Sequence, residues 1–550
     1  MSQATPRRLV AHGAVAELIQ DPGSSPAGLA LGPTPAEPEI DPVDRSDLGR
    51  QVRGGMRWSL LNSVLLRFLN VAVSIEMARL LVPEDYGLYA VGTVVLMVLQ
   101  SMNELGTSVA VVRWQGDVTR PARTATTIAY GSSFLLWGTT FLLAPAVADA
   151  LNAPDATTLL RVLSFSVLID AVSSIPNALL TRGFMQRQRA MVDGAGLVLS
   201  SAISITLATR GWGAMSLACG ALVGNVLCTT LICRLAPAFP RPGWNRTDAE
   251  GLLRVGLPLA GTSLVFLAIL NVDYIVVGRE LDPEQLGYYL LAFNLASWPP
   301  NILSVAVRRV AVPAFARLAD DRDALDRAFA RSVSLLGTIS LLAAVLLTTL
   351  GPELIHVVYL PRWSPAVEAL RWLAVLGACR VLIDLAYDAL AAVGRTRRLL
   401  ALQVAWLVTL IPALAIGTRD GGILGAAIAH VVVAVGVVIP LYVVALGKAG
   451  IRPASLAGAM GRVLVATAAS AAAVLACGTV SLGELGTLLA GGVTGTVVFL
   501  AIAVRPDDRR LVARWVDGRL ASGRLGTPRH MAASPDPWRG SLSASAAFRE

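Results

Sequence analysis

Residues 79–89 read RLLVPEDYGLY, and residues 279–289 read RELDPEQLGYY. Arg, Leu, Pro, Glu, Gly and Tyr fall at equivalent positions in the two copies. Each copy ends one long apolar stretch and begins the next, so the repeat predicts two related halves within one chain. Because proline cannot continue a helix and glycine frees the backbone, we expect each copy to form a turn. The hinge residues of these turns are Pro83, Gly87, Pro283 and Gly287.

The composition of the chain excludes a single soluble globule. Of its 550 residues, 55% are hydrophobic and only 15% are charged, whereas a soluble domain carries about 25% charged residues. The chain is therefore predicted to be an integral membrane protein that crosses the bilayer many times. A net charge of +9 would suggest nucleic acid as the partner of a soluble protein. Here the basic residues lie in short loops that orient helices, so we expect no nucleic acid to bind.

Apolar stretches long enough to cross a bilayer occur fourteen times, which predicts an all-α membrane protein with about 14 transmembrane helices. They cover residues 57–79, 87–111, 125–149, 158–180, 190–209, 213–235, 252–277, 287–307, 332–359, 366–391, 398–417, 421–446, 460–480 and 483–503. The polar segments 1–50 and 506–550 are expected to be disordered extensions.

The basic residues of the connecting segments fix the predicted topology. Alternate segments, starting at the N-terminus, are rich in arginine, whereas the segments between them hold few basic residues: Arg79, Arg210, Arg279, Arg362 and Arg419. Because basic loops stay on the cytoplasmic side, both termini are predicted to be cytoplasmic and the number of spans to be even. The turns at 79–89 and 279–289 then lie on the outer side, where we expect them to help hold an outer gate.

The repeat extends beyond the two turns. Asn177-Ala-Leu before Gly183 resembles Asp388-Ala-Leu before Gly394. Six spans per copy give both copies the same membrane orientation, so the halves should be related by a pseudo-twofold axis along the membrane normal, an architecture typical of transporters. We expect two six-helix lobes and a C-terminal helix pair, which cover residues 51–246, 247–447 and 448–505.

The sequence carries no motif of hydrolytic or metal chemistry. Its five cysteines lie inside apolar stretches without the spacing of zinc ligands. The Walker-type phosphate loop, HExxH and GxSxG are missing from the sequence. We therefore expect no metal, no cofactor and no enzymatic activity, and a transporter built from this chain would not hydrolyse ATP itself.

The motifs around the hinge resemble a known family. The turn RLLxPEDYGLY, the segment DYIVVGR at 273–279 and LGYY at 286–289 are similar to the polysaccharide-exporter branch of the multidrug/oligosaccharidyl-lipid/polysaccharide (MOP) flippase superfamily. This branch includes the O-antigen and capsule repeat-unit flippases, and the resemblance covers about residues 55–505. It implies an exporter that flips polyprenyl-pyrophosphate-linked oligosaccharide from the inner to the outer leaflet.

Polar residues inside a membrane are costly, so they indicate a wet cavity or a polar partner. Asn294, Ser297, Asn301 and Arg308, together with Ser304, are spaced by three or four residues, which places them on one helix face. This face either lines a substrate cavity or forms a polar seam between helices, with Arg308 reaching the inner interface. We favour the cavity.

Arg67 lies deep within the first apolar stretch and shares a helix face with Asn70 and Ser74. A guanidinium group can donate to two oxygens of a pyrophosphate at once. The alternative is a structural ion pair with Glu104 or Asp170. We include Arg67 and Asn70 among the candidate substrate-binding residues.

Four more charges in apolar stretches either bind a coupling ion or have structural roles. Asp170 is a proton or cation site or a hydrogen-bonded structural residue. Arg380 and Asp384 are one helical turn apart and either pair with each other or contact a ligand. Asp273 either pairs with Arg279 or caps the bundle.

Residues and resemblance together predict a secondary transporter of the bacterial plasma membrane that flips a lipid-linked oligosaccharide by alternating access during cell-surface polysaccharide biosynthesis. Expected partners are this substrate, membrane lipid, a polysaccharide polymerase and glycosyltransferases. The alternatives are a lipid II flippase, a drug or cation antiporter of the same superfamily, and a membrane-embedded glycosyltransferase or polymerase. An antiporter should have a carboxylate-dominated cavity, and an enzyme should have a large soluble loop with paired carboxylates. The sequence favours neither an antiporter nor an enzyme.

Overall fold

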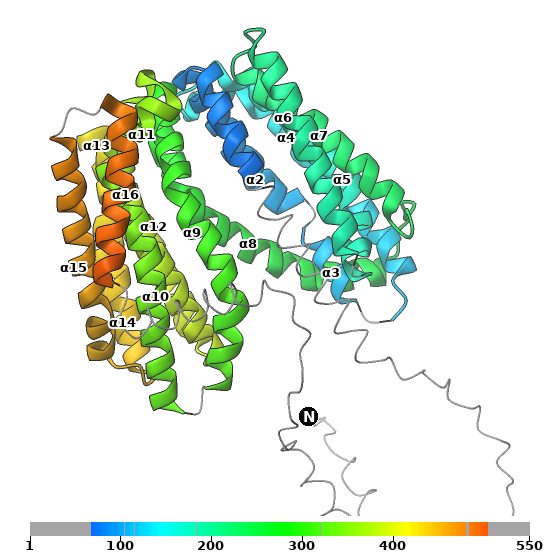
Figure 1. The fold of residues 1–550 in the computed structure, drawn as a ribbon. Helices are drawn as coiled ribbons and strands as arrows, with labels where there is room; N and C mark the ends of the chain where they lie inside the picture. The colour runs from blue at the N-terminus through cyan, green and yellow to red at the C-terminus, as the bar shows by residue number, and fades with distance from the viewer. Residues whose placement is uncertain are drawn as a thin grey trace, which may run out of the picture. The chain divides into compact units, whose positions relative to one another are not determined.

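The computed structural model describes residues 66, 68–103, 105–114, 116–183, 185–318, 321–479 and 483–503, with some side chains on three of the helices excepted. Within these ranges the regular structure is entirely helical, which confirms the predicted fold class (Figure 1). The predicted extensions 1–50 and 506–550 lie outside the described residues, as does Arg67.

The helices follow the apolar stretches of the sequence. Residues 68–80 are helical and are followed by α2 (Pro83–Asn103), α3 (Thr107–Arg113), α4 (Thr119–Ala150), α5 (Ala156–Arg182), α6 (Gln186–Ala208), α7 (Ala214–Leu235), α8 (Arg246–Glu280), α9 (Pro283–Arg317), α10 (Arg322–Thr349), α11 (Gly351–Leu354), α12 (Ala366–Ala392), α13 (Thr396–Val433), α14 (Ile439–Gly447), α15 (Pro453–Gly478) and α16 (Gly483–Ala503). Between α11 and α12 lie a π-helical turn, η1 (Ile355–Tyr359), and a 3-10 turn, η2 (Pro361–Trp363).

The chain is a multi-pass membrane protein. Among the described residues, nine helical stretches are long and apolar enough to cross a membrane. One of them, Arg398–Gly447, contains a break at Gly421 and Gly422, where Gly422 has a φ of 57°. This break falls where the sequence separates two predicted spans. The total of 14 spans remains a prediction.

One predicted span is divided in the structure. The apolar stretch 87–111 becomes α2 and α3, because Leu105 and Gly106 adopt left-handed φ angles of 46° and 71°. At this point the backbone of Gly106 meets that of Gly256 on α8, so closely that a Cβ on Gly106 would lie 2.3 Å from the Gly256 carbonyl oxygen. The hydropathy of the stretch does not reveal this break, because it serves a tertiary contact.

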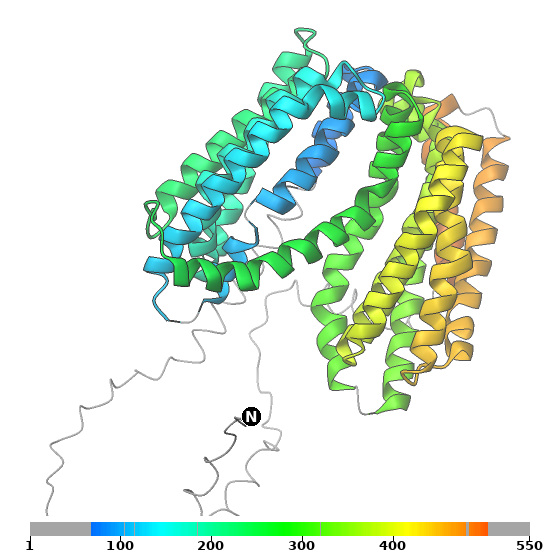
Figure 2. The ribbon, with the colours of Figure 1, turned by 180° about the vertical axis from the view of Figure 1, so that it is seen from behind.

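The helices pack in sets that α8 connects. In the N-terminal part, α4 packs on α5, α6 on α7, and α2 and α7 both on α5. In the C-terminal part, α12 packs on α9, α10 and α13, while α15 and α16 pack on each other and on α10. The long helix α8 contacts α3 and α4 as well as α13, so it spans between the two sets (Figure 2).

The two copies of the repeat meet each other at the start of α2 and α9 (Figure 1). A Cβ on Gly87 would lie 1.6 Å from the Pro283 carbonyl oxygen, and one on Gly287 would lie 1.9 Å from the Pro83 carbonyl oxygen. We call these reciprocal approaches the hinge contact, and the end of the bundle that carries them the hinge end. Only a hydrogen atom fits at either glycine.

The role expected for the two glycines is therefore corrected. Gly87 and Gly287 lie inside α2 and α9 rather than in the turns, and their function is close helix packing. Pro83 and Pro283 begin their helices, where the missing N–H costs no hydrogen bond. The turn before α9 is closed by Asp282, whose Oδ1 accepts from the Gln285 backbone N–H at 2.8 Å.

The loop between α11 and α12 holds the end of the helix 68–80. Arg79 donates from Nε to the Val358 carbonyl oxygen at 2.8 Å, and Trp363 donates from Nε1 to the Ala78 carbonyl oxygen at 2.9 Å. The Trp363 ring is fully buried and lies edge-on to Tyr86 of the first repeat, 5.2 Å between ring centroids. It also lies 6.0 Å from Tyr288 of the second repeat. One side chain thus contacts both copies.

We predict that Gly87→Val opens the hinge end. The added side chain must displace the Pro283 carbonyl, and overpacking of this kind costs about 1–3 kcal/mol, so the ratio of closed to open molecules should fall about tenfold. Spin labels at Arg210→Cys and Asp420→Cys, both exposed and placed in a cysteine-free background, would report the distance across this end.

The matched control is Gly138→Val on α4, where a Cβ meets nothing within 4 Å. It makes the same change within a helix and should leave the distance distribution unchanged. Equal distributions for the two variants would show that the close approach at Gly87 does not hold this end closed.

Candidate functional site

The polar face of α9 begins at the hinge contact. Gly287, Asn294 and Asn301 follow one another at intervals of seven residues, which is close to two helical turns, so they share one face. At Gly287 this face touches α2, but Asn294 and Asn301 are exposed. The face that closes the hinge end is therefore uncovered further along the helix.

The other predicted members of this face are only partly described. Ser297 is half-buried. Arg308 lies within α9, but its side chain and that of Ser304 lie outside the described residues. On the helix 68–80, Asn70 is exposed, and Arg67 lies outside the described residues. A contact between the two sets of predicted substrate-binding residues remains a prediction.

Asp170 on α5 is held by two amide side chains. Gln100 of α2 donates from Nε2 to Oδ2 at 2.9 Å, and Asn225 of α7 donates from Nδ2 to Oδ1 at 2.8 Å. Nearby, Asn103 donates from Nδ2 to the Val167 carbonyl oxygen at 3.1 Å. These bonds tie three helices together with neutral donors, and the carboxylate has a donor on each oxygen.

Sequence reasoning singled out Asp170 but not its partners. Gln100 and Asn225 are amides within apolar stretches, and their cost inside a membrane was the available signal. The sequence could not pair them with Asp170, because the three residues come from different helices whose relative rotation is set by packing.

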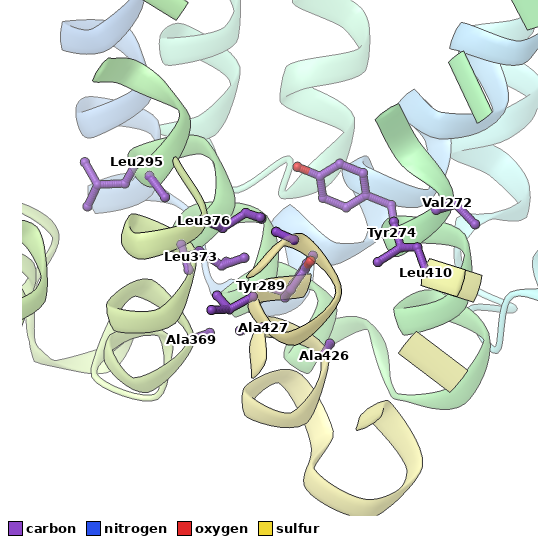
Figure 3. Close-up of a cluster of buried hydrophobic side chains, with 14 of the residues drawn as sticks. Val272, Tyr274, Tyr289, Leu295, Ala369, Leu373, Leu376, Leu410, Ala426 and Ala427 are labelled. Carbon is purple, nitrogen blue, oxygen red and sulfur yellow. The ribbon is translucent and has the colours of Figure 1, made fainter. Parts of the chain in front are cut away.

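Asp273 on α8 lies in the core of the C-terminal set and is 1% exposed. Its Oδ2 accepts from the Tyr289 hydroxyl at 3.0 Å and lies 3.5 Å from His430 Nε2. Figure 3 shows Tyr289 and Tyr274 within a shell of aliphatic residues from α12 and α13, among them Leu373, Leu376, Ala426 and Ala427.

The expected pairing of Asp273 with Arg279 is wrong. Six residues along a helix correspond to more than one and a half turns, so the two side chains point away from each other. Arg279 is exposed, whereas Asp273 faces the core and bonds to Tyr289. Sequence reasoning did not identify His430 or Tyr289 as its neighbours.

Arg380 and Asp384 lie one turn apart on α12, both half-buried. The Arg380 guanidinium lies over the Phe293 ring of α9, 5.8 Å from its centroid. This ring also packs against Tyr274, 5.4 Å away, and His430, 6.3 Å away. Arg380 therefore belongs to the cluster around Asp273. Within the described part of the chain, no group of three or more His, Cys, Asp or Glu side chains could hold a metal ion.

A family model for polysaccharide biosynthesis proteins matches residues 76–368, which is more than half of the chain. The chain belongs to this family. The match includes both copies of the hinge repeat, α8, α9 and the loop that carries Trp363.

Curated relatives of the chain have names from the same field. The lipopolysaccharide biosynthesis protein WzxC of Escherichia coli is 25% identical over 69% of this chain and 77% of its own length. The succinoglycan biosynthesis transport protein ExoT of Rhizobium meliloti is 25% identical over the same shares, 69% and 77%. The teichuronic acid biosynthesis protein TuaB of Bacillus subtilis is 21% identical over 63% of this chain and 72% of its own. All three names refer to polysaccharide biosynthesis, and ExoT is named as a transport protein.

Solved structures show the fold that the chain shares. The lipid II flippase MurJ in an inward closed conformation has a TM-score of 0.69, with 13% identity over 84% of this chain and all of its own. An inward-facing multidrug resistance MATE transporter of the MOP superfamily has a TM-score of 0.53, with 20% identity over 69% of this chain and 95% of its own. These likenesses show that the chain shares the fold of these two transporters, which agrees with the fold that the resemblance predicts.

We predict that Asn225→Ala destabilises the N-terminal set of helices. The substitution leaves Asp170 Oδ1 without its donor, and losing a hydrogen bond to a charged group within the membrane should cost about 1–2 kcal/mol. The measurement is the thermal unfolding of the purified protein. Thr230→Ala is the control on the same helix, because the Thr230 hydroxyl is exposed and bonds only to the Val226 carbonyl oxygen of its own helix. Equal melting temperatures for the two variants would contradict a role for the Asp170 cluster in stability.

Proposed function

We propose that this protein flips a polyprenyl-pyrophosphate-linked oligosaccharide from the inner to the outer leaflet of a bacterial plasma membrane. It does so as a secondary transporter without ATP hydrolysis, and both of its termini are cytoplasmic. Membership in the polysaccharide biosynthesis family, the names of the relatives and the shared transporter fold support this proposal.

The observation that carries the proposal is the course of the polar face of α9. At Gly287 the face is closed by the other repeat, while Asn294 and Asn301 are exposed beyond it. A path between two lobes that is closed at one end and polar further along suits alternating access. The lobes are residues 51–246 and 247–447, with the helix pair 448–505 beside the second lobe.

The chemistry of this face suits a sugar. An amide side chain offers both donors and an acceptor, and sugar hydroxyls need both. Asn294 and Asn301 are separated by about 10 Å along the helix, from a rise of about 1.5 Å per residue, so they can bind successive parts of a glycan. Arg67 and Arg308 bind the pyrophosphate, and Asn70 and Ser297 complete the polar lining. The polyprenyl tail stays in the lipid between the lobes.

The other substrate classes have weaker support. Likeness to the lipid II flippase is a likeness of fold at 13% identity, whereas the curated relatives are named for other surface polysaccharides. Against an antiporter, the exposed polar residues within the described part of the α9 face are amides. The carboxylates Asp170 and Asp273 bond to neighbouring helices instead. A polymerase and glycosyltransferases would then act on either side of the transport step.

We predict that Asn294→Leu combined with Asn301→Leu slows flipping at least about tenfold, because two hydrogen bonds of about 1 kcal/mol each are lost. The assay uses purified protein in liposomes that carry a fluorescent polyprenyl-pyrophosphate oligosaccharide, and it measures how fast the glycan becomes accessible to an externally added quencher. Thr230→Leu, an exposed polar-to-apolar change on α7, is the control and should leave the rate unchanged.

Three results would overturn the proposal. The wild-type protein could fail to move the oligosaccharide lipid above protein-free liposomes, it could move lipid II alone, or it could export a lipophilic cation along an ion gradient instead. A double variant as fast as the wild type would instead remove the α9 face from the substrate path.

A further inference from the structure

His356 occupies a junction between three parts of the second half of the chain. It lies on η1, and its Nδ1 is 2.9 Å from Glu484 Oε1 at the start of α16. Its Nε2 is 2.8 Å from the hydroxyl of Ser364, which follows η2. The His356 side chain is 27% exposed and that of Glu484 is 58% exposed, so both can exchange protons with water.

The hydrogen bonds around Ser364 determine how many protons His356 holds. The Ser364 hydroxyl lies 2.5 Å from the Pro361 carbonyl oxygen. A carbonyl oxygen can only accept, so the single hydroxyl proton of Ser364 is donated to it. Ser364 must then accept from His356 Nε2, and Glu484 accepts from Nδ1. An imidazolium, in which both ring nitrogens are donors, fits this set of contacts.

The same assignment of hydrogen bonds argues against a nucleophilic role for Ser364. Glu484, His356 and Ser364 are connected in the order carboxylate, imidazole, hydroxyl, which is also the order of an acyl-transfer triad. In such a triad the hydroxyl donates its proton to the imidazole. Here the hydroxyl donates to Pro361 instead, so the imidazole is the donor and the cluster is suited to binding a proton.

His356 stabilises the loop that fastens the hinge end. We call residues 355–365 the gate loop. Val357 and Val358, next to His356, accept from Arg79 at 3.2 and 2.8 Å. On the other side of the loop, Trp363 and Arg362 donate to the carbonyl oxygens at the end of the helix 68–80. The two nitrogens of His356 connect the two sides of the gate loop and fasten both to α16.

Four charged groups lie on or beside the elements packed against η1. They are Glu353 on α11, Glu484 on α16, Arg362 on η2 and Arg79 on the helix 68–80. Glu484 contacts the ring directly, and Glu353 lies one helical turn before His356. The two arginines direct their guanidinium groups to backbone carbonyls. The immediate charged neighbour of the His356 ring is therefore a carboxylate.

We propose that His356 is a proton-operated latch for the hinge end: its protonated form orders the gate loop and holds the two halves of the transporter together, and its neutral form releases them. Histidine ordinarily changes charge between pH 5 and 8, so acid conditions favour the closed hinge end and alkaline conditions favour the open one. The role of the latch in regulating transport rests on the proposed function. Its effect on the conformation of the hinge end can be measured without knowing the substrate.

The test measures conformation rather than transport. Spin labels at Arg210→Cys and Asp420→Cys report the distance across the hinge end of the full chain in lipid nanodiscs without substrate. We expect the ratio of closed to open molecules to fall about fivefold between pH 5.5 and pH 8. A change of this size is expected when one charge-assisted hydrogen bond near the surface is lost. In His356→Gln, which cannot titrate, and in Glu484→Gln, which lacks the counter-charge, the ratio should change less than twofold.

Glu280→Gln is the matched control. It removes another ion pair at the same end, in which Arg419 donates to Glu280 at 2.9 Å, and it should keep the full pH response. The proposal is overturned if the wild type shows no pH response or if His356→Gln responds as the wild type does. It is also overturned if Glu280→Gln abolishes the response as completely as His356→Gln. Because no lipid-linked sugar is used, a failure here leaves the proposed substrate untouched, and a failure of the flipping assay leaves the latch untouched.

Discussion

The structure depends on two backbone segments coming closer than any side chain permits. Gly87 meets the carbonyl of Pro283, and Gly287 meets the carbonyl of Pro83. Because both contacts use the same motif, the interface has the reciprocity of a twofold dimer interface within a single chain. The same glycine-to-carbonyl packing is therefore used twice, once by each copy of the motif. The position of α2 against α9, and hence of the polar face that continues along α9, follows from it.

The gate loop breaks this symmetry. The connection between α4 and α5 is short, whereas the corresponding connection between α10 and α12 contains α11, η1 and η2. Its Trp363 packs against Tyr86 of one repeat and Tyr288 of the other. Its backbone accepts from the Arg79 side chain, and the Trp363 indole donates to the Ala78 carbonyl oxygen at the end of the helix 68–80. The gate loop, which belongs to one half of the chain, therefore contacts both repeats. Together with the hinge contact it can hold the hinge end more tightly than the hinge contact alone. These hydrogen bonds from Arg and Trp side chains to carbonyl oxygens can also break and re-form, because water can replace either partner.

Polar residues within the helices divide into two kinds in this protein. Asp170 and Asp273 each bond to residues from other helices and so connect helices within one set. Asn294 and Asn301 are exposed, on a face that α2 covers at Gly287. The bonds made by the first kind specify helix packing, because a polar group left without a partner in an apolar surrounding is costly. Polar groups of the second kind lie on the surface that the proposed substrate would contact.

The sequence by itself determined the all-helical membrane class, the repeat, the family resemblance and the helical face that joins Asn294 to Asn301. These properties depend on composition and on the local period of a helix, which a linear pattern contains. The tertiary structure decided the rest: that Gly87 and Gly287 serve packing instead of turns, that the stretch 87–111 breaks at Leu105, and that Asp273 bonds to Tyr289 rather than Arg279. The contact between His356 and Glu484 is likewise visible only in the tertiary structure. Each of these facts depends on how far one helix is rotated and shifted against another, and that is set by the fit of side chains from distant parts of the chain.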